Sequence, residues 1–204
     1  ADDVRVIATG YGRVAVPYAH KVVTEITCHG TGAVLLFGDH GTVIDVGGQD
    51  TKVIQIKGGR VAKFAMNDKC AAGTGRFLEM TMSRVGSDIT SIDTFVEGAE
   101  PVTINSMCAV FAESEIIGLL AQETPPGSIA LGCIYSICRR TAIFAQKLAP
   151  EHPKVFFSGG LAQSQVVREV LARYLDVESV AAHPLCQYNG AIGAAVLGWK
   201  RVNR

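Results

Sequence analysis

The chain has 204 residues, of which 48% are hydrophobic and 19% charged, a composition typical of an α/β protein with a sizeable core. Lysine plus arginine and aspartate plus glutamate balance at 19 each, so no net charge attracts nucleic acid or anionic lipid. The six cysteines include no Cys-x-x-Cys pair, which argues against a thioredoxin motif or a four-cysteine zinc site.

The patterning also bears on location. We expect no apolar run long enough to cross a bilayer, and the N-terminal ADDVRVIATG lacks the basic region and apolar core of a signal peptide. A cysteine-stapled secreted scaffold does not fit a chain of this size. The sequence therefore predicts a cytoplasmic protein without a membrane partner.

Apolar periodicity predicts strands and helices that form a mixed α/β sheet covered by helices. In chain order, we expect a strand at residues 4–9, a helix at 24–37, strands at 42–46, 52–56 and 61–65, a helix at 75–85, a polar loop at 86–99, a short strand at 102–104, helices at 109–122 and 128–148, a strand at 155–158, and helices at 163–174 and 189–199. The prolines at 125 and 126 with Gly127 end one helix, and Ser128 caps the next. The small residues of 189–199 suit close packing.

A glycine pair follows each of two expected buried strands. Asp45-Val46-Gly47-Gly48-Gln49-Asp50 follows the first, and Ser158-Gly159-Gly160 ends the second. Glycines let backbone N–H groups approach a phosphate, and the carboxylate of Asp45 could hold a Mg²⁺-bound water. An isolated glycine pair more often serves turn geometry, although an Asp-x-Gly-Gly-x-Asp motif at a strand end is more specific. The lysine motif of P-loop ATPases is absent.

Two cysteines precede expected helices. Cys70 in NDKCAAGTGRFLE lies just before a Gly-Thr-Gly turn that opens a helix, and Cys108 in NSMCAVFAESE is followed by a helix. The start of a helix presents unpaired N–H groups and the positive end of the helix dipole, which favour a thiolate. A four-iron cluster needs four thiolates, and two identical subunits on a two-fold axis would supply them. On spacing alone, burial of both thiols in the core remains the alternative. For Cys28, Cys133, Cys138 and Cys186 we expect burial.

Longer motifs resemble the activator ATPases (component A) of 2-hydroxyacyl-CoA dehydratases, in the BadF/BadG/BcrA/BcrD ATPase family, which also includes ATP-hydrolysing subunits of benzoyl-CoA reductase. The motifs are DVGGQDTKVI, FAMNDKCAAGTGRFLE, SMCAVFAESE, SGGLAQ and QYNGAIGAAVLG. The resemblance covers nearly the whole chain, and it makes core burial of Cys70 and Cys108 the minority interpretation.

The resemblance implies an actin/hexokinase/Hsp70-like (ASKHA, ribonuclease H-like) ATPase fold. It implies a homodimer that holds one [4Fe-4S] cluster on Cys70 and Cys108 of each subunit, with ATP or ADP and Mg²⁺ as further cofactors. ATP binding and hydrolysis would change the angle between the cluster-bearing helices. An electron from ferredoxin or flavodoxin would then pass to a partner dehydratase, make a ketyl radical from the acyl-CoA substrate and so permit elimination of a poorly activated β-proton.

The site residues follow from the matched motifs. We expect Asp45 and Gln49 to organise Mg²⁺ and water for catalysis. We expect the nucleotide to be bound by Asp45, Gly47, Gly48, Gln49, Asp50, Gly73, Gly159, Gly160 and Gln187. Two lobes are expected: residues 1–41 as the remainder of the first ATPase lobe, joined by the helix of 189–204, and residues 42–188 as the second lobe with the cysteines.

One departure from the family pattern opens further alternatives. Members of this fold normally begin with strands that carry a first phosphate loop, whereas this chain enters at the segment leading to TGYGR. Hydrolysis of Mg-ATP by this polypeptide is therefore in question. Besides the activator, we consider an ATP-hydrolysing subunit of a benzoyl-CoA reductase-type complex and a non-hydrolysing assembly or regulatory module.

Overall fold

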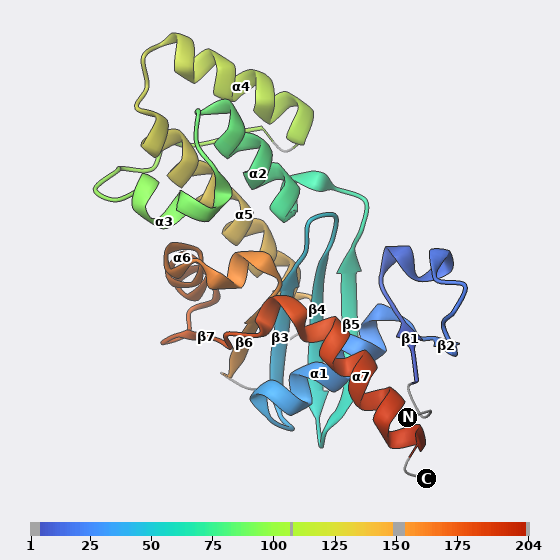
Figure 1. Cartoon of the computed structure of the whole chain (residues 1–204). Helices are drawn as coiled ribbons and strands as arrows, with labels where there is room; N and C mark the ends of the chain where they lie inside the picture. The colour runs from blue at the N-terminus through green and yellow to red at the C-terminus, as the bar shows by residue number, and fades with distance from the viewer. Residues whose placement is uncertain (1–4, 107, 149–153, 203–204) are drawn as a thin grey trace.

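The computed structural model describes residues 5–106, 108–148 and 154–202. Figure 1 shows the elements, which in chain order are β1 (Ile7–Ala8), β2 (Lys21–Val22), α1 (Glu25–Phe37), β3 (Gly41–Val46), β4 (Thr51–Lys57), β5 (Arg60–Asn67), α2 (Gly75–Arg84), α3 (Ile92–Phe95), α4 (Ala109–Ala121), α5 (Pro126–Gln146), β6 (Val155–Ser158), α6 (Gln165–Leu175), β7 (Val180–Ala182) and α7 (Asn189–Val202). Val4 of the first expected strand, Met107 of the second cysteine motif and residues 203–204 of the C-terminal segment lie outside the described residues.

The main sheet has five strands in the order β5-β4-β3-β6-β7. The pairs β5–β4 and β4–β3 are antiparallel, because a hairpin and a short loop connect them. The pairs β3–β6 and β6–β7 are parallel, since helices lie between these strands in the chain. The carboxyl ends of β3 and β6 therefore meet at one edge of the sheet, and both glycine pairs follow directly from that edge.

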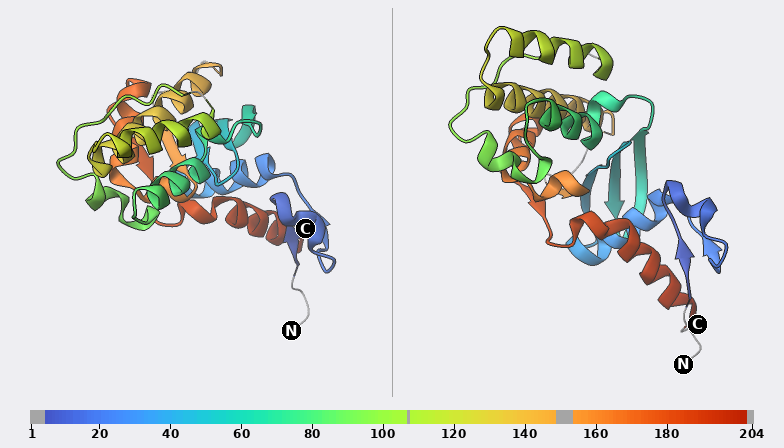
Figure 2. Two further views of the ribbon diagram at one scale, coloured as in Figure 1. Left: turned by 90° about the horizontal axis from the view of Figure 1, so that it is seen from above. Right: turned by 45° about the horizontal axis from the view of Figure 1, so that its top comes forward.

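Alternation along the central strands divides the core between the two faces of the sheet. Ile44, Val46 and Val53 pack into the larger cluster with residues of α2, α5 and α6. Val43, Ile54 and Ile56 point to the opposite face and pack against α1. β3 is buried along its whole length, as expected for a strand that is covered on both faces. Figures 1 and 2 show α1 and α7 side by side against the sheet, away from α2 and α4.

The contact between α1 and α7 depends on small residues. A Cβ atom added at Gly32 would overlap the carbonyl of Asn189, and one at Gly193 would overlap the carbonyl of Cys28. Larger side chains would force the two helices apart. The expectation that the small-residue C-terminal helix packs closely is thus met, and its partner is α1.

Four expectations about local structure need correction. Residues 102–104 are extended but join no sheet, and the expected loop at 86–99 contains the short helix α3. The strands β2 and β7 were not expected, because a run of two or three residues carries too little alternation to detect. The two helices are separated at the prolines as expected, but Ser128 lies inside the second helix and does not cap it. Helix α5 begins at Pro126, which is tolerated in the first turn because its missing N–H would have no helical partner there.

The expectation about apolar runs also needs correction. Within the described residues, α5 is long and apolar enough to cross a membrane by length and composition, with a mean hydropathy of 1.2. However, 67% of its most apolar window is buried inside the protein. The core helix of a globular protein meets the same criteria, so this helix is weak evidence for a membrane span.

Candidate functional site

Three polar side chains form a row across the centre of the sheet. Asp45 of β3 is the register partner of Lys52 on β4 and of Ser158 on β6. Register partners point to the same face, so pairing of the strands brings these side chains together. Ser158 Oγ donates a 2.7 Å hydrogen bond to Asp45 Oδ1, and Lys52 Nζ lies 3.4 Å from Asp45 Oδ2. All three residues are buried, which fixes the direction of the Asp45 carboxylate.

Lys52 also pairs with a second buried carboxylate. Its Nζ donates a 2.5 Å hydrogen bond to Asp50 Oδ1, while the hydroxyl of Tyr11 donates to Asp50 Oδ2 at 3.4 Å. Burial lowers the pKa of Lys52, but the charges of Asp45 and Asp50 raise it, and the net effect is a raised pKa. Lys52 is therefore a cation held between two anions. Sequence reasoning missed Lys52, although its position two residues after Asp50 places both side chains on one face of β4.

Asp45 also lies beside α1, where its neighbour is His29. His29 in turn contacts Asn189 at the start of α7. His29 Nδ1 lies 3.4 Å from Asp45 Oδ1. Asn189 Nδ2 donates a 3.1 Å hydrogen bond to the carbonyl of His29 and lies 3.4 Å from its Nδ1. Gly190 lies against the imidazole, where a Cβ atom would come within 2.9 Å of Nε2. His29 is thus a packing and hydrogen-bonding residue that connects α1 and α7 to Asp45.

The two glycine turns line a cavity of about 490 Å³ at the carboxyl ends of β3 and β6. A separate cavity of about 520 Å³ lies outside this site. Gly47, Gly48, Gly160 and Gln187 are among the lining residues of the first cavity. A Cβ atom at Gly48 or Gly160 would meet nothing within 4 Å, so open space lies directly over the backbone there. The two glycine turns thus lie on one cavity, at the position where nucleotides bind in open α/β sheets.

Gly159 has a different role from its neighbour. Its φ of +91° lies in the region that favours glycine, and a Cβ atom would overlap the carbonyl of Val46. Gly159 therefore allows the turn after β6 to pack against the end of β3. It does not line the cavity, and substitution there would separate the two strands.

The start of α2 is hydrogen-bonded to the first glycine turn. The N–H of Gly75 donates to the carbonyl of Gly47 at 2.8 Å, and that of Arg76 donates to Gly48 at 3.2 Å. These N–H groups, which every helix leaves without a helical partner, are therefore satisfied by the turn and not by a bound anion. Because Cys70 lies shortly before Gly75 in the chain, these hydrogen bonds connect the Cys70 segment to the glycine turn of the cavity.

Asp93 is a further lining residue that the sequence did not indicate, because it lies in the unexpected helix α3. Its carboxylate accepts hydrogen bonds from the hydroxyl of Ser164 and, at 2.8 Å, from the N–H of Gln165. Ser164 in turn caps α6 by accepting from the N–H of Val167 at 3.1 Å. Asp93 thereby fixes α3 to the start of α6 and closes one wall of the cavity.

Cys70 is exposed and lies in a loop that several hydrogen bonds hold in place. Asn67 Nδ2 donates to the carbonyl of Cys70 at 3.4 Å, and Thr51 Oγ1 donates to the carbonyl of Gly73 at 2.6 Å. Cys70 lines a cavity of about 360 Å³ together with Arg140 and Lys147, and none of the described residues that line it is an aspartate or a glutamate. This cationic surrounding suits an anionic centre bound at this cysteine.

Cys108 is also exposed, and the loop before it is held from two sides. Glu115 accepts hydrogen bonds from the N–H of Asn105 at 2.9 Å and from the N–H of Ser106 at 2.8 Å. Arg140 Nη2 donates to the carbonyl of Ser106 at 2.8 Å. Burial raises the pKa of Glu115, but the hydrogen bonds from Asn105 and Ser106 lower it, and the net effect is a lowered pKa. Figures 1 and 2 draw the loop before α2 and the start of α4 at the same end of the molecule.

The remaining cysteines are buried, as expected. Burial raises the pKa of Cys133 to about 11 and that of Cys138 to about 12, so both remain thiols. Cys133 accepts a hydrogen bond from Thr81 Oγ1 at 3.6 Å, and Cys138 donates to the carbonyl of Val167 at 3.6 Å. Burial also raises the pKa of Cys28 and of Cys186. These environments suit packing, in contrast to those of Cys70 and Cys108.

The other expected site residues are distributed around the cavity. Asp45 and Asp50 lie buried in the sheet and are not among its lining residues. Gln49 is exposed at the turn. Gly73 lines the cavity of Cys70 and not that of the glycine turns. The structure therefore brings Gly47, Gly48, Gly160 and Gln187 together and places Asp45 at the strand end beside them.

A sheet with an antiparallel half and a parallel half, and two glycine turns over a buried carboxylate, defines an ATPase of the actin/hexokinase/Hsp70-like fold. The expected fold class is thus confirmed. Two solved structures agree with it. The component A of (R)-2-hydroxyglutaryl-CoA dehydratase from Acidaminococcus fermentans has a TM-score of 0.90 and 40% identity, with 97% of this chain and 76% of that chain covered. The activator of the 2-hydroxyisocaproyl-CoA dehydratase from Clostridium difficile with bound ADPNP has a TM-score of 0.91 and 34% identity, with 98% and 74% covered.

The chain belongs to the BadF/BadG/BcrA/BcrD ATPase family, whose pattern it matches over residues 1–198. The (R)-2-hydroxyglutaryl-CoA dehydratase activating ATPase of Acidaminococcus fermentans is 40% identical over 197 residues, which are 96% of this chain and 75% of that protein. A benzoyl-CoA reductase subunit of Thauera aromatica is 29% identical in an alignment of 206 positions that covers 97% of this chain and 72% of that protein. The expected family membership is confirmed.

The buried ion pairs of Lys52 with Asp45 and Asp50 lead to a first prediction, which concerns stability. Lys52→Met should destabilise the fold by about 3–5 kcal/mol, because it leaves two buried carboxylates without their cation. Adding Asp50→Asn to Lys52→Met should recover part of the loss. Urea unfolding followed by circular dichroism measures both, with Lys63→Met on the exposed part of β5 as the matched control. A Lys52→Met protein as stable as the control would show that the ion pairs do not support the fold.

Proposed function

We propose that this chain is an ATP-driven activator that passes single electrons to a 2-hydroxyacyl-CoA dehydratase. The observation that carries the proposal is the connection through α2. One end of that helix is hydrogen-bonded to the glycine turn of the cavity, and the exposed thiol of Cys70 lies in the loop directly before it. A nucleotide at the turn would therefore act on the segment that bears the thiol. The names and the 34–40% identity of the dehydratase activators support the choice of partner.

In this proposal the cavity of the glycine turns binds ATP with Mg²⁺. Backbone N–H groups of Gly48 and Gly160 would face the phosphates, Gly47 would line the cavity with its N–H bonded to the carbonyl of Asp50, and Gln187 would contact the nucleotide. Asp45 would orient the metal-bound water, and Gln49 would position the attacking water. Ser158 and Lys52 hold the Asp45 carboxylate in one direction before the nucleotide arrives, which is the kind of preorganisation that accelerates phosphoryl transfer.

The thiols fit an iron–sulfur cluster that two chains share. Among the described residues, no three histidine, cysteine, aspartate or glutamate side chains come together as a metal site. One chain therefore supplies too few ligands, whereas Cys70 and Cys108 of two chains would supply four. A [4Fe-4S] cluster would provide one-electron transfer there. Arg140 and Lys147 would offset its negative charge, and Glu115 would hold the Cys108 loop in place.

Nucleotide exchange would bias how the two subunits meet. ATP and ADP can shift that arrangement only if each binds one arrangement more tightly than the other. The hydrogen bonds from Gly75 and Arg76 to the glycine turn give the nucleotide a direct mechanical link to the Cys70 loop. A packed interface has discrete arrangements, so a small shift at the turn can select between them.

The proposal includes further partners and a division into lobes. The electron donor would be a ferredoxin or a flavodoxin, and the location would be the cytoplasm. Residues 1–41 with the helix of 189–204 would belong to one lobe, and residues 42–188 to the other. The benzoyl-CoA reductase relative, at 29% identity, is less similar than the dehydratase activators, and we therefore prefer the dehydratase as the partner.

The cluster ligands are tested by removing one thiol at a time. Cys70→Ser and Cys108→Ser should each abolish iron binding, since two ligands per cluster are lost when each of two chains loses one. Anaerobic iron and sulfide determination together with subunit mass measures this. Cys138→Ala, which alters a buried thiol, should retain the iron. Full iron in either serine variant would refute the cluster assignment.

The role of Asp45 is tested by Asp45→Asn. ATP turnover should fall by about 10²–10³-fold, because the amide carries no charge to orient a metal-bound water. Phosphate release measures turnover, and the iron content should remain unchanged. Asp39→Asn, which alters an exposed carboxylate, is the control. Turnover within a factor of two of the unmodified chain would exclude Asp45 from hydrolysis.

The hold on the Cys108 loop is tested by Glu115→Gln. One amide oxygen cannot replace two carboxylate oxygens, so stability should fall by about 1–3 kcal/mol and iron should be lost faster. Because the pKa of Glu115 is lowered, its stabilising effect is present above the pKa of an unfolded glutamate and is lost as the pH falls through the folded value. The variant should lack this acid-side loss. Glu113→Gln, whose partner is Arg84, is the matched control on the same helix.

A further inference from the structure

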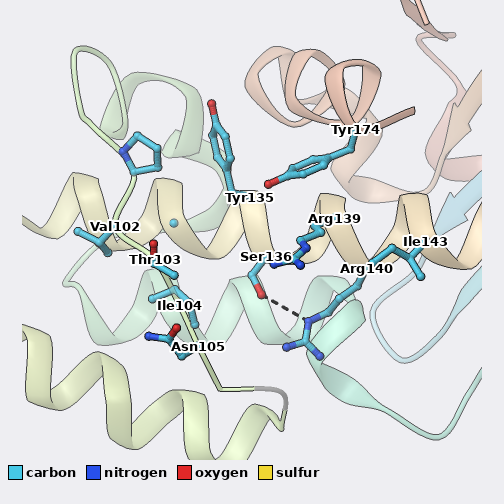
Figure 3. Close-up of a pocket in the computed structure, with 12 residues that line it drawn as sticks. Val102, Thr103, Ile104, Asn105, Tyr135, Ser136, Arg139, Arg140, Ile143 and Tyr174 are labelled. Carbon is cyan, nitrogen blue, oxygen red and sulfur yellow. Dashed lines mark hydrogen bonds between the residues drawn. The ribbon is translucent and has the colours of Figure 1, made fainter. Parts of the chain in front are cut away.

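A second groove lies on the other side of α5 from the glycine turns. Its volume is about 520 Å³, and it is enclosed by the extended residues 101–105, by the side of α5 that carries Tyr135, Arg139 and Ile143, and by Tyr174 of α6 (Figure 3). We call it the α5 groove. It shares no lining residue with the cavity of the glycine turns, and no expected site residue lines it.

The α5 groove is cationic. Arg139 and Arg140 are among its lining residues, and no aspartate or glutamate is. At the rim, Arg173 Nη1 donates a 3.1 Å hydrogen bond to the hydroxyl of Tyr135. Arg139 is exposed, and no hydrogen bond or ion pair is recorded for it in the part of the chain that the structure describes. Its charge is therefore available to an anionic ligand.

The walls of the groove are formed before any ligand binds. Tyr135 and Tyr174 meet edge to face, with ring centroids 6.1 Å apart and an interplanar angle of 80°. Arg140 holds the opposite wall through Ser106 and lies 3.4 Å from Ser136 through its Nε atom, a contact drawn in Figure 3. Rigid walls reduce the entropy lost on binding, so a ligand would find its contacts in place.

The extended wall offers backbone groups to a ligand. Residues 101–105 alternate between exposed and half-buried, as an edge strand would, but they pair with no strand. Val102 donates its N–H to Ser128, and Asn105 donates its N–H to Glu115. For the backbone of Thr103 and Ile104, no hydrogen bond is recorded among the described residues. Successive residues of an extended chain present their backbone groups to opposite sides, so Ile104 presents its groups to the same side as Val102, the side of α5. An extended peptide could accept and donate hydrogen bonds there.

We infer that the α5 groove is a docking site for an extended, acidic segment of a partner protein. Main-chain hydrogen bonds to Ile104 would hold the segment, and a carboxylate of the segment would pair with Arg139. The groove is continuous with the cysteine region, because Arg140 and Ile143 line both the groove and the cavity of Cys70. A segment bound there would place its protein beside the thiols. This choice of partner rests on the proposed electron transfer.

Binding of a defined peptide tests the inference without the partner. The probe is a blocked, fluorescein-labelled hexapeptide of alternating glutamate and valine, and its comparison is the same peptide with glutamine for glutamate. The glutamate peptide should bind at least fivefold more tightly, and raising the salt from 50 to 300 mM should weaken it. Arg139→Gln should weaken its binding about fivefold or more. Lys200→Gln, at the exposed end of α7, is the charge-matched control and should change nothing.

Three results would overturn the inference: equal binding of the two peptides, binding unaffected by Arg139→Gln, or displacement by inorganic phosphate or free glutarate at the concentration of the peptide. The last result would indicate a site for small anions. Anisotropy is measured on iron-free and iron-loaded protein, since the groove needs no iron. Peptide binding by a chain that never takes up iron would refute the proposed electron transfer and leave the docking site intact.

Discussion

The buried contact of Lys52 with Asp45 and Asp50 is the constraint on which the rest of the site depends. A charge in the core is tolerated only when it is paired, and here one cation serves two anions, one on β3 and one in the turn directly before β4. The pairing fixes the register of β3 against β4, and Ser158 extends it to β6. Both glycine turns therefore begin at a common edge, and the cavity between them follows from that register.

Backbone hydrogen bonds connect the cavity to the segments that bear the thiols and fix their positions relative to it. The first glycine turn accepts from the start of α2, so its position sets the position of that helix. The Cys70 loop is held in addition by Thr51, which lies at the start of β4 beside the charge row. Around Cys108, Glu115 and Arg140 hold the loop by its N–H groups and its carbonyl. Neither thiol is placed by packing in the core, which leaves both exposed.

Much of this could be predicted from the sequence, because the relevant signals are local. A buried apolar strand followed by Asp-x-Gly-Gly predicts both the strand and the turn. A cysteine before a helical repeat predicts the position of Cys108 at the start of α4. Cys70 is separated from α2 by a short turn, and the first N–H groups of that helix are bonded to the glycine turn. Lys52 could not be recognised, since a lysine in an alternating strand is read as a solvent-facing residue. Asp93 was missed with α3, whose four residues are too few for a helical period. The α5 groove was missed because its walls come from three distant segments.

Although the net charge is zero, the negatively and positively charged groups are concentrated at different sites, and this separation suits the proposed chemistry. Beneath the glycine turns, two carboxylates face one ammonium group, and the excess negative charge favours a cation that accompanies a nucleotide. Around Cys70 the sign of the charge is reversed. Arg140 and Lys147 line that cavity, and no aspartate or glutamate among the described residues does. Thiolates and a negative inorganic centre gain from that surrounding, and an acidic protein segment in the α5 groove gains from the same Arg140 and its neighbour Arg139. One helix, α5, therefore presents cations to the thiol cavity and to the groove, while its apolar face fills the core between them.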